Sequence, residues 1–211
     1  MRARASRPWG TRGTRGARAG RAAVAAAVVG AALLLSGCGG DSGSGATVPE
    51  GWGTLDTKSL SVGYPKDEGY AEQPAGERAK ANAAVALKEE DGIRTGMVSV
   101  QLNFATGVRD AAGAAAAAGA GIGLNSTRKA TEDVRLAGPA DAREAREARR
   151  IDYDFTADGQ ENTPSRGTPM TGVLVAGVDT KGVPFVVRLN AVKDAVDAED
   201  LDAFVESITV K

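Results

Sequence analysis

The sequence predicts an α+β protein in which helices cover a mainly antiparallel sheet. Two features near the C-terminus are the clearest. The runs Thr171–Val178 and Val183–Leu189 flank the turn sequence Asp179–Gly182, which predicts a β-hairpin. Four apolar residues then recur at helical spacing from residue 201 to residue 208, which predicts a helix of roughly Ala198–Ser207 lying on a core. This stripe consists of Leu201, Phe204, Val205 and Ile208, and Asp197 is placed to cap the helix.

Shorter alternating runs extend the predicted sheet towards the N-terminus. Leu60–Tyr64 alternates and stops at Pro65, which has no backbone N–H for a strand ladder. Ala84–Leu87 and Met97–Phe104 continue the pattern, and alternation returns at residues 151–155. In these runs one face is apolar and the other polar, so we expect antiparallel strands with one solvated face. The apolar faces contain Val98, Val100, Leu102 and Phe104 in one run and Ile151, Tyr153 and Phe155 in the other.

Two further segments carry helix-forming residues. Asp110–Leu124 is rich in alanine, but each of its four glycines costs about 1 kcal/mol in a helix, so this helix needs packing to persist. Small side chains there leave open whether an apolar pocket lies between helix and sheet. Asp141–Arg150 combines helix-forming composition with a position directly before an alternating run, and we favour a long strand over a helix. Two aromatic clusters are candidates for binding, but with only 4% aromatic residues in the chain we expect most of them to serve as core. They are Trp52, Tyr64 and Tyr70 in one cluster and Tyr153, Phe155 and Phe185 in the other.

The N-terminus has the organisation of an export signal. Residues 1–21 contain seven arginines and no acid, and the next 14 residues, Ala22–Leu35, are apolar and uncharged. A membrane-spanning helix needs about 20 apolar residues, whereas 7 to 15 behind a basic segment are typical of a secretory signal peptide. We therefore expect residues 1–37 to be a signal peptide.

The apolar run ends in Leu35, Ser36, Gly37 and Cys38, and this motif resembles the lipobox of bacterial lipoproteins. The resemblance implies that Cys38 is modified with acyl chains such as palmitate and becomes the new N-terminal residue. Two acyl chains anchor a protein stably to a bilayer. We expect localisation at the extracytoplasmic face of the cell membrane, with residues 38–50 as lipidated cysteine and flexible linker and residues 51–211 as a single domain.

Composition excludes several kinds of chemistry. The chain has no histidine and one cysteine, so triads with a histidine base and internal disulfides are excluded. Without the seven N-terminal arginines, 19 basic and 27 acidic residues remain, a net charge of −8 that disfavours nucleic-acid binding. Ser59, Ser61, Ser126 and Ser165 stand in no nucleophile motif. The sequence therefore assigns no catalytic residue and no cofactor, and it leaves the ligand-binding residues unknown.

One acidic segment invites a metal hypothesis that we do not favour. With Asp154 as its first position, Asp158 and Gly159 match a calcium loop, but the last position is Ser165 instead of glutamate. Asp152 and Glu161 complete the acidic cluster. Solvent-facing strand acids followed by a turn explain these residues better, so we assign no metal ligand.

The order of elements is similar to one known family. Tyr64-Pro65 after an early strand, and Ser207, Ile208 and Val210 after a closing helix, resemble the PsbP-like α/β/α sandwich of the LpqN/LpqT type of actinobacterial lipoproteins. A tryptophan is commoner in the family shortly after the proline, where the nearest aromatic here is Tyr70. The resemblance implies an envelope-associated, non-enzymatic binding or accessory role. We expect the partner to be an envelope protein or, if a pocket lies beside the Ala-rich helix, an apolar ligand such as a lipid. The alternative is a carboxylate-dependent hydrolase of envelope material, and the oligomeric state stays open.

Overall fold

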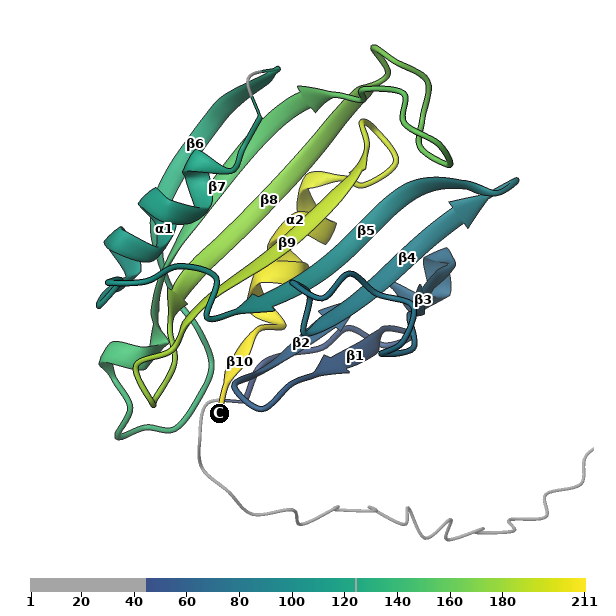
Figure 1. Ribbon diagram of the computed structural model, residues 1–211. Helices are drawn as coiled ribbons and strands as arrows, with labels where there is room; N and C mark the ends of the chain where they lie inside the picture. Colours follow the sequence, from purple (N-terminus) through teal and green to yellow (C-terminus); the bar gives the residue numbers. More distant parts are fainter. Residues whose placement is uncertain (1–44, 124) are drawn as a thin grey trace, which may run out of the picture. The chain divides into compact units, whose positions relative to one another are not determined.

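The computed structural model describes residues 45–123 and 125–211, which belong to one compact unit, Gly40–Lys211 (Figure 1). A seven-stranded antiparallel sheet forms the middle layer. Its strands, in spatial order, are β3 (Tyr70–Glu72), β4 (Ala84–Glu90), β5 (Ile93–Leu102), β9 (Pro184–Val192), β8 (Pro169–Val178), β7 (Glu147–Thr156) and β6 (Ser126–Arg135). The α+β class and the antiparallel pairing predicted from the sequence are therefore confirmed.

The other elements cover the two faces of this sheet. Helix α1 (Ala111–Ala120) lies on one face, over β7 and β8, and α2 (Ala198–Glu206) lies on the other (Figure 1). On the α2 side lies a second antiparallel sheet of β1 (Gly53–Asp56), β2 (Leu60–Tyr64) and β10 (Thr209–Val210). Two 3₁₀ turns, η1 (Lys66–Glu68) and η2 (Glu144–Arg146), complete the described elements.

Separate apolar clusters fill the spaces on either side of the large sheet. The larger one joins the sheet to α2 and the small sheet and contains Phe185, Phe204 and Ile208, each fully buried. The smaller one joins α1 to residues such as Ile151 and Leu174 on the opposite face. The expectation of one solvated sheet face is thus wrong for β8 and β9, because layers cover these central strands on both sides.

Aromatic side chains in this fold lie across glycines of neighbouring strands. A Cβ atom on any of these glycines would come within 3.0 Å of the aromatic ring, so only glycine leaves the space. The pairs are Tyr64 with Gly53, Tyr70 with Gly96, Tyr153 with Gly172 and Phe185 with Gly177. Apart from the half-buried Trp52 and Phe155, the aromatic residues predicted as core are buried, which confirms that role.

The predicted C-terminal helix is confirmed. Asp197 caps α2 by accepting a hydrogen bond from the Asp200 backbone N–H at 3.0 Å, and the Asp200 carboxylate accepts one from the Asp197 backbone N–H. Phe204 and Ile208 are fully buried, whereas Leu201 lies at the edge of the cluster. The predicted hairpin is also present, with Val178 opposite Pro184.

Two sequence expectations need correction. Asp141–Arg150, where the sequence favours a long strand, is strand only from Glu147, the start of β7; residues 141–143 lie in a turn region and Glu144–Arg146 form η2. Phe104 does not share a face with Val98, because β5 ends at Leu102 and Asn103 adopts a left-handed φ of 53°. Phe104 consequently packs against the α1-side cluster, while Val98 belongs to the α2-side cluster.

Candidate functional site

A groove opens on the α1 side of the large sheet, beyond the C-terminal end of α1. It consists of two adjoining cavities of about 450 and 250 Å³. Both are lined by Met97, Phe155, Asp158 and Asn190, so the two cavities lie next to each other along the sheet. We call this feature the sheet-face groove and treat it as the candidate functional site.

Apolar side chains dominate the groove where it runs away from α1. Met97 of β5 and Phe155 of β7 are half-buried in its floor, and the segment between β7 and β8 supplies Ala157 and Pro164. Leu87 and Met170 also line this part, and Ile122 lines the part next to α1. Half-buried apolar side chains around a concave space are typical of sites for apolar ligands.

A hydrogen-bonded pair on the sheet brings polar atoms into the same groove. Tyr153, Gly172 and Asn190 stand directly opposite one another on β7, β8 and β9. The Tyr153 ring crosses the glycine, and its hydroxyl donates a hydrogen bond of 2.6 Å to Asn190 Oδ1. Burial raises the pKa of Tyr153 to about 12, although the positive charge of Arg188 favours the ionised form. The hydroxyl is therefore protonated at neutral pH and remains a donor.

Arg188 contributes a positive charge at the α1 end of the groove. Its guanidinium donates to the Ala118 carbonyl oxygen at 3.3 Å, in the last turn of α1, where the helix dipole favours a cation. No salt bridge joins Arg188 to a carboxylate within the part of the chain that the structure describes. The groove thus combines an apolar floor with a tyrosine–asparagine pair and two cations, Arg188 next to α1 and Arg94 at the far end.

The open question of a pocket beneath the Ala-rich helix has a structural answer. α1 packs directly on the sheet, with Ala114, Ala115 and Ala118 buried against the smaller cluster. A Cβ atom on Gly119 would lie 2.9 Å from Arg128 Nη2, so the small residues serve close approach. The hollow begins only where the helix ends.

A larger cavity of about 680 Å³ lies at the other end of α1. Its lining carries charges of both signs, from Arg109 and Arg143 and from acids that include Asp141 and Glu144. Asp179, which also lines it, has its carboxylate engaged by the backbone N–H groups of residues 181 and 183, each at 2.8 Å. The apolar part of this lining consists of alanines and Val178 only, without a larger apolar side chain, so we do not choose this cavity as the candidate site.

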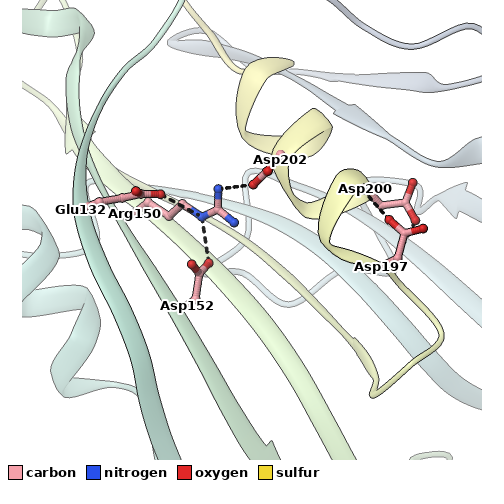
Figure 2. A network of polar contacts seen from close by, with 6 residues as sticks. All are labelled: Glu132, Arg150, Asp152, Asp197, Asp200 and Asp202. Carbon is pink, nitrogen blue, oxygen red and sulfur yellow. Dashed lines mark hydrogen bonds and ion pairs between the residues drawn. The ribbon is translucent and has the colours of Figure 1, made fainter.

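Two of the acids considered for calcium, Asp152 and Asp154, bind cations of the protein itself. Arg150 contacts Asp152 at 2.8 Å, Asp202 of α2 at 2.5 Å and Glu132 of β6 at 3.5 Å (Figure 2). Asp154 contacts Lys193 at 2.9 Å and Lys129 at 3.5 Å, and the hydrogen bond from Lys193 lowers its pKa. Within residues 45–123 and 125–211, no group of three or more acids, cysteines or histidines is placed to hold a metal ion.

The remaining predicted site residues are dispersed or lie outside the described residues. The lipobox lies outside the residues that the structure describes; it consists of Leu35, Ser36, Gly37 and Cys38. Ser59 is buried, and Ser126 lies at the α1 end of the groove, where its hydroxyl donates to the Gly123 carbonyl oxygen. The Tyr153–Asn190 pair was not predicted, because its signal, a glycine opposite a tyrosine, depends on strand register.

Among the described residues, no helix is long and apolar enough to cross a membrane.

Comparison of the chain with protein-family models and with curated proteins finds no match.

Proposed function

We propose that this protein is a lipid-anchored extracytoplasmic module that binds an apolar envelope ligand in the sheet-face groove without catalysing a reaction. The single observation that carries the ligand proposal is the pair of adjoining cavities that share an apolar floor at Met97 and Phe155. The tyrosine–asparagine pair supplies the few oriented polar groups that ligand sites use for specificity.

The sequence supports the anchor and the envelope location. A basic segment, a short apolar run and a lipobox ending in Cys38 stand at the N-terminus in that order. The layered arrangement of α1, the large sheet and α2 supports our further proposal that the domain is a PsbP-like sandwich.

A carboxylate-dependent hydrolase is the weaker alternative. Glycosidase-type hydrolysis uses two carboxylates that flank the scissile bond. Among the described residues that line the sheet-face groove, only Asp158 carries a carboxylate. The carboxyl group whose pKa is raised, that of Glu68, lies on η1 and lines none of the cavities described above.

The groove is tested by purifying the full-length protein from its own membranes and recording native mass spectra. We expect an apolar molecule to accompany the wild-type chain. The variant Met97→Glu places a charge in the groove floor and should lose that molecule. The matched control is Ile93→Glu, also on β5, where the side chain is exposed and lies outside the groove lining. A wild-type spectrum without bound molecule, or equal loss in both variants, would refute the ligand proposal.

The anchor is tested separately by growing cells with labelled palmitate. Label should appear in the wild-type protein and be absent from Cys38→Ser, because Cys38 is the only cysteine of the chain. Label in both proteins, or in neither, would contradict lipidation at this residue.

A further inference from the structure

Strand β6 leaves one edge of the large sheet open. It is the last strand in the spatial order, and it pairs with β7 on its inner side only, among the residues that the structure describes (Figure 1). Eight of its ten residues are exposed, the exceptions being Ser126 and Val134. The opposite edge strand, β3, has three residues. A ten-residue edge offers a row of backbone donors and acceptors to another strand.

The outer edge carries an ordered set of charges. Arg128 and Lys129 occupy its first half, Glu132 and Asp133 its second half, and Arg135 ends the strand. Each of Lys129, Glu132 and Asp133 already contacts a charged residue of β7, yet their side chains are 57%, 54% and 77% exposed. These charges therefore remain accessible to a neighbour.

A β-bulge determines which of these charges share a face. Arg128 stands opposite Tyr153 and Ala130 opposite Asp152, so Lys129 is an extra residue in the strand. Because of this insertion, Arg128 lies on the same face as Thr131 and Asp133, which stand opposite Tyr153, Ile151 and Arg149. The bulge at Lys129 lies on the other face with Glu132, since Lys129 contacts Asp154 and Glu132 contacts Arg150.

We propose that two copies of this chain associate by antiparallel pairing of β6 with β6, which would extend the sheet across both copies. A two-fold axis through Thr131 places Thr131 opposite its equivalent in the second copy. Counting outwards from Thr131, Ala130 and the extra residue Lys129 both face the second copy's Glu132. The next residue, Arg128, faces the second copy's Asp133. Both matches join opposite charges on a common face of the sheet, and each occurs twice because of the symmetry.

The charge pattern selects a second copy over other strands. Charged side chains on an edge normally discourage pairing, because an unrelated strand does not neutralise them. Neutralising these charges requires an antiparallel strand with acids opposite Arg128 and Lys129 and bases opposite Glu132 and Asp133. A second copy of β6 has this pattern. Without the bulge, the same axis would place Lys129 opposite Asp133, but Arg128 would face Val134 and Glu132 would face Ala130. The bulge therefore raises the number of opposite-charge matches from one to two in each half of the pairing.

Charge reversal tests the pairing in the full-length chain in detergent by sedimentation equilibrium. Arg128→Asp and Asp133→Arg each place like charges opposite one another, so each variant should dimerise roughly tenfold or more weakly than the wild type. A one-to-one mixture of the two variants restores opposite charges at both contacts and should recover dimers of wild-type affinity. Monomeric wild-type protein at every concentration up to its solubility limit, or no recovery in the mixture of folded variants, would refute the proposal.

A second experiment keeps all charges and does not depend on how the charge variants fold. Thr131→Cys places a thiol on the proposed axis, where mild oxidation should link two chains through residue 131. The matched control is Glu72→Cys, an exposed position on β3 at the other edge of the same sheet. Selective cross-linking of Thr131→Cys supports the proposal, whereas no cross-linking or equal cross-linking of both variants overturns it.

Discussion

Glu68 is a carboxylate that the fold holds in an unfavourable place. Its partial burial raises its pKa, Asp200 of α2 adds to the rise, and Lys88 opposes it. Asp67 and Asp197 contribute further in the same direction as Asp200. A raised folded-state pKa means that the folded protein binds this proton more tightly than the unfolded chain does. Folding is therefore favoured while Glu68 is protonated, and stability is lost as the pH rises through the pKa of the unfolded carboxyl and then that of the folded one.

Replacing Glu68 with glutamine should remove this pH-dependent penalty. We expect the melting temperature of Glu68→Gln relative to wild type to increase as the pH rises from about 3 to about 7, because only wild type acquires the charge. Thermal unfolding followed by circular dichroism at several pH values measures this difference. Glu72→Gln, an exposed carboxyl on β3, serves as the control. A difference between Glu68→Gln and wild type that stays constant across this range would contradict the assignment.

At the scale of elements, α2 depends on an apolar stripe and a capping box. Phe204 is fully buried between α2 and the large sheet, so Phe204→Ala should destabilise the protein by about 3 to 5 kcal/mol. The control Glu206→Ala, on the exposed side of the helix, should change stability by less than about 0.5 kcal/mol. Urea unfolding measures both values. Equal stability of Phe204→Ala and wild type would show that the stripe is not part of the core.

Elements with one buried face could be predicted from sequence, and those without could not. In α2 and in β7 from Ile151 onwards, the spacing of the apolar residues follows the buried face of the element. Both elements were predicted from this spacing, and both predictions are confirmed. Strand β6 was missed because it is exposed on both faces, so its sequence shows no apolar alternation. Segment 141–146 was misassigned because it packs little and its charges suit either a strand or a turn.

The sheet-face groove lay beyond sequence analysis for a different reason. Its polar pair depends on Tyr153, Gly172 and Asn190 standing in one row across three strands, which only the register determines. The sequence did indicate an open question about space near the Ala-rich helix, but it placed that space under the helix. Alanine and glycine let α1 approach the sheet closely, so the space appears beyond its end.

At the scale of the whole molecule, Arg150 links the large sheet to the layer beneath it. It projects from β7 on the α2 side, its side chain is 12% exposed, and it binds carboxylates of β6, β7 and α2 (Figure 2). Burial opposes its charge, but the hydrogen bonds to Asp152 and Asp202 outweigh this effect, and the pKa of Arg150 is raised. A single cation thus compensates acids from three elements.

Removing this cation should leave those acids uncompensated. We expect Arg150→Ala to destabilise the protein by about 1 to 3 kcal/mol, a value kept below that of a fully buried pair because the carboxylates are partly exposed. Adding Asp202→Ala to this variant should cost less than Asp202→Ala costs in wild type, since its partner is already absent. Arg149→Ala is the matched control, because Arg149 contacts the exposed Asp133 on the other face of the sheet. This control should reduce the free energy of unfolding by less than Arg150→Ala does. Urea unfolding of the four variants measures these differences, and strict additivity of the Arg150 and Asp202 substitutions would show that the bridge between the layers contributes nothing to stability.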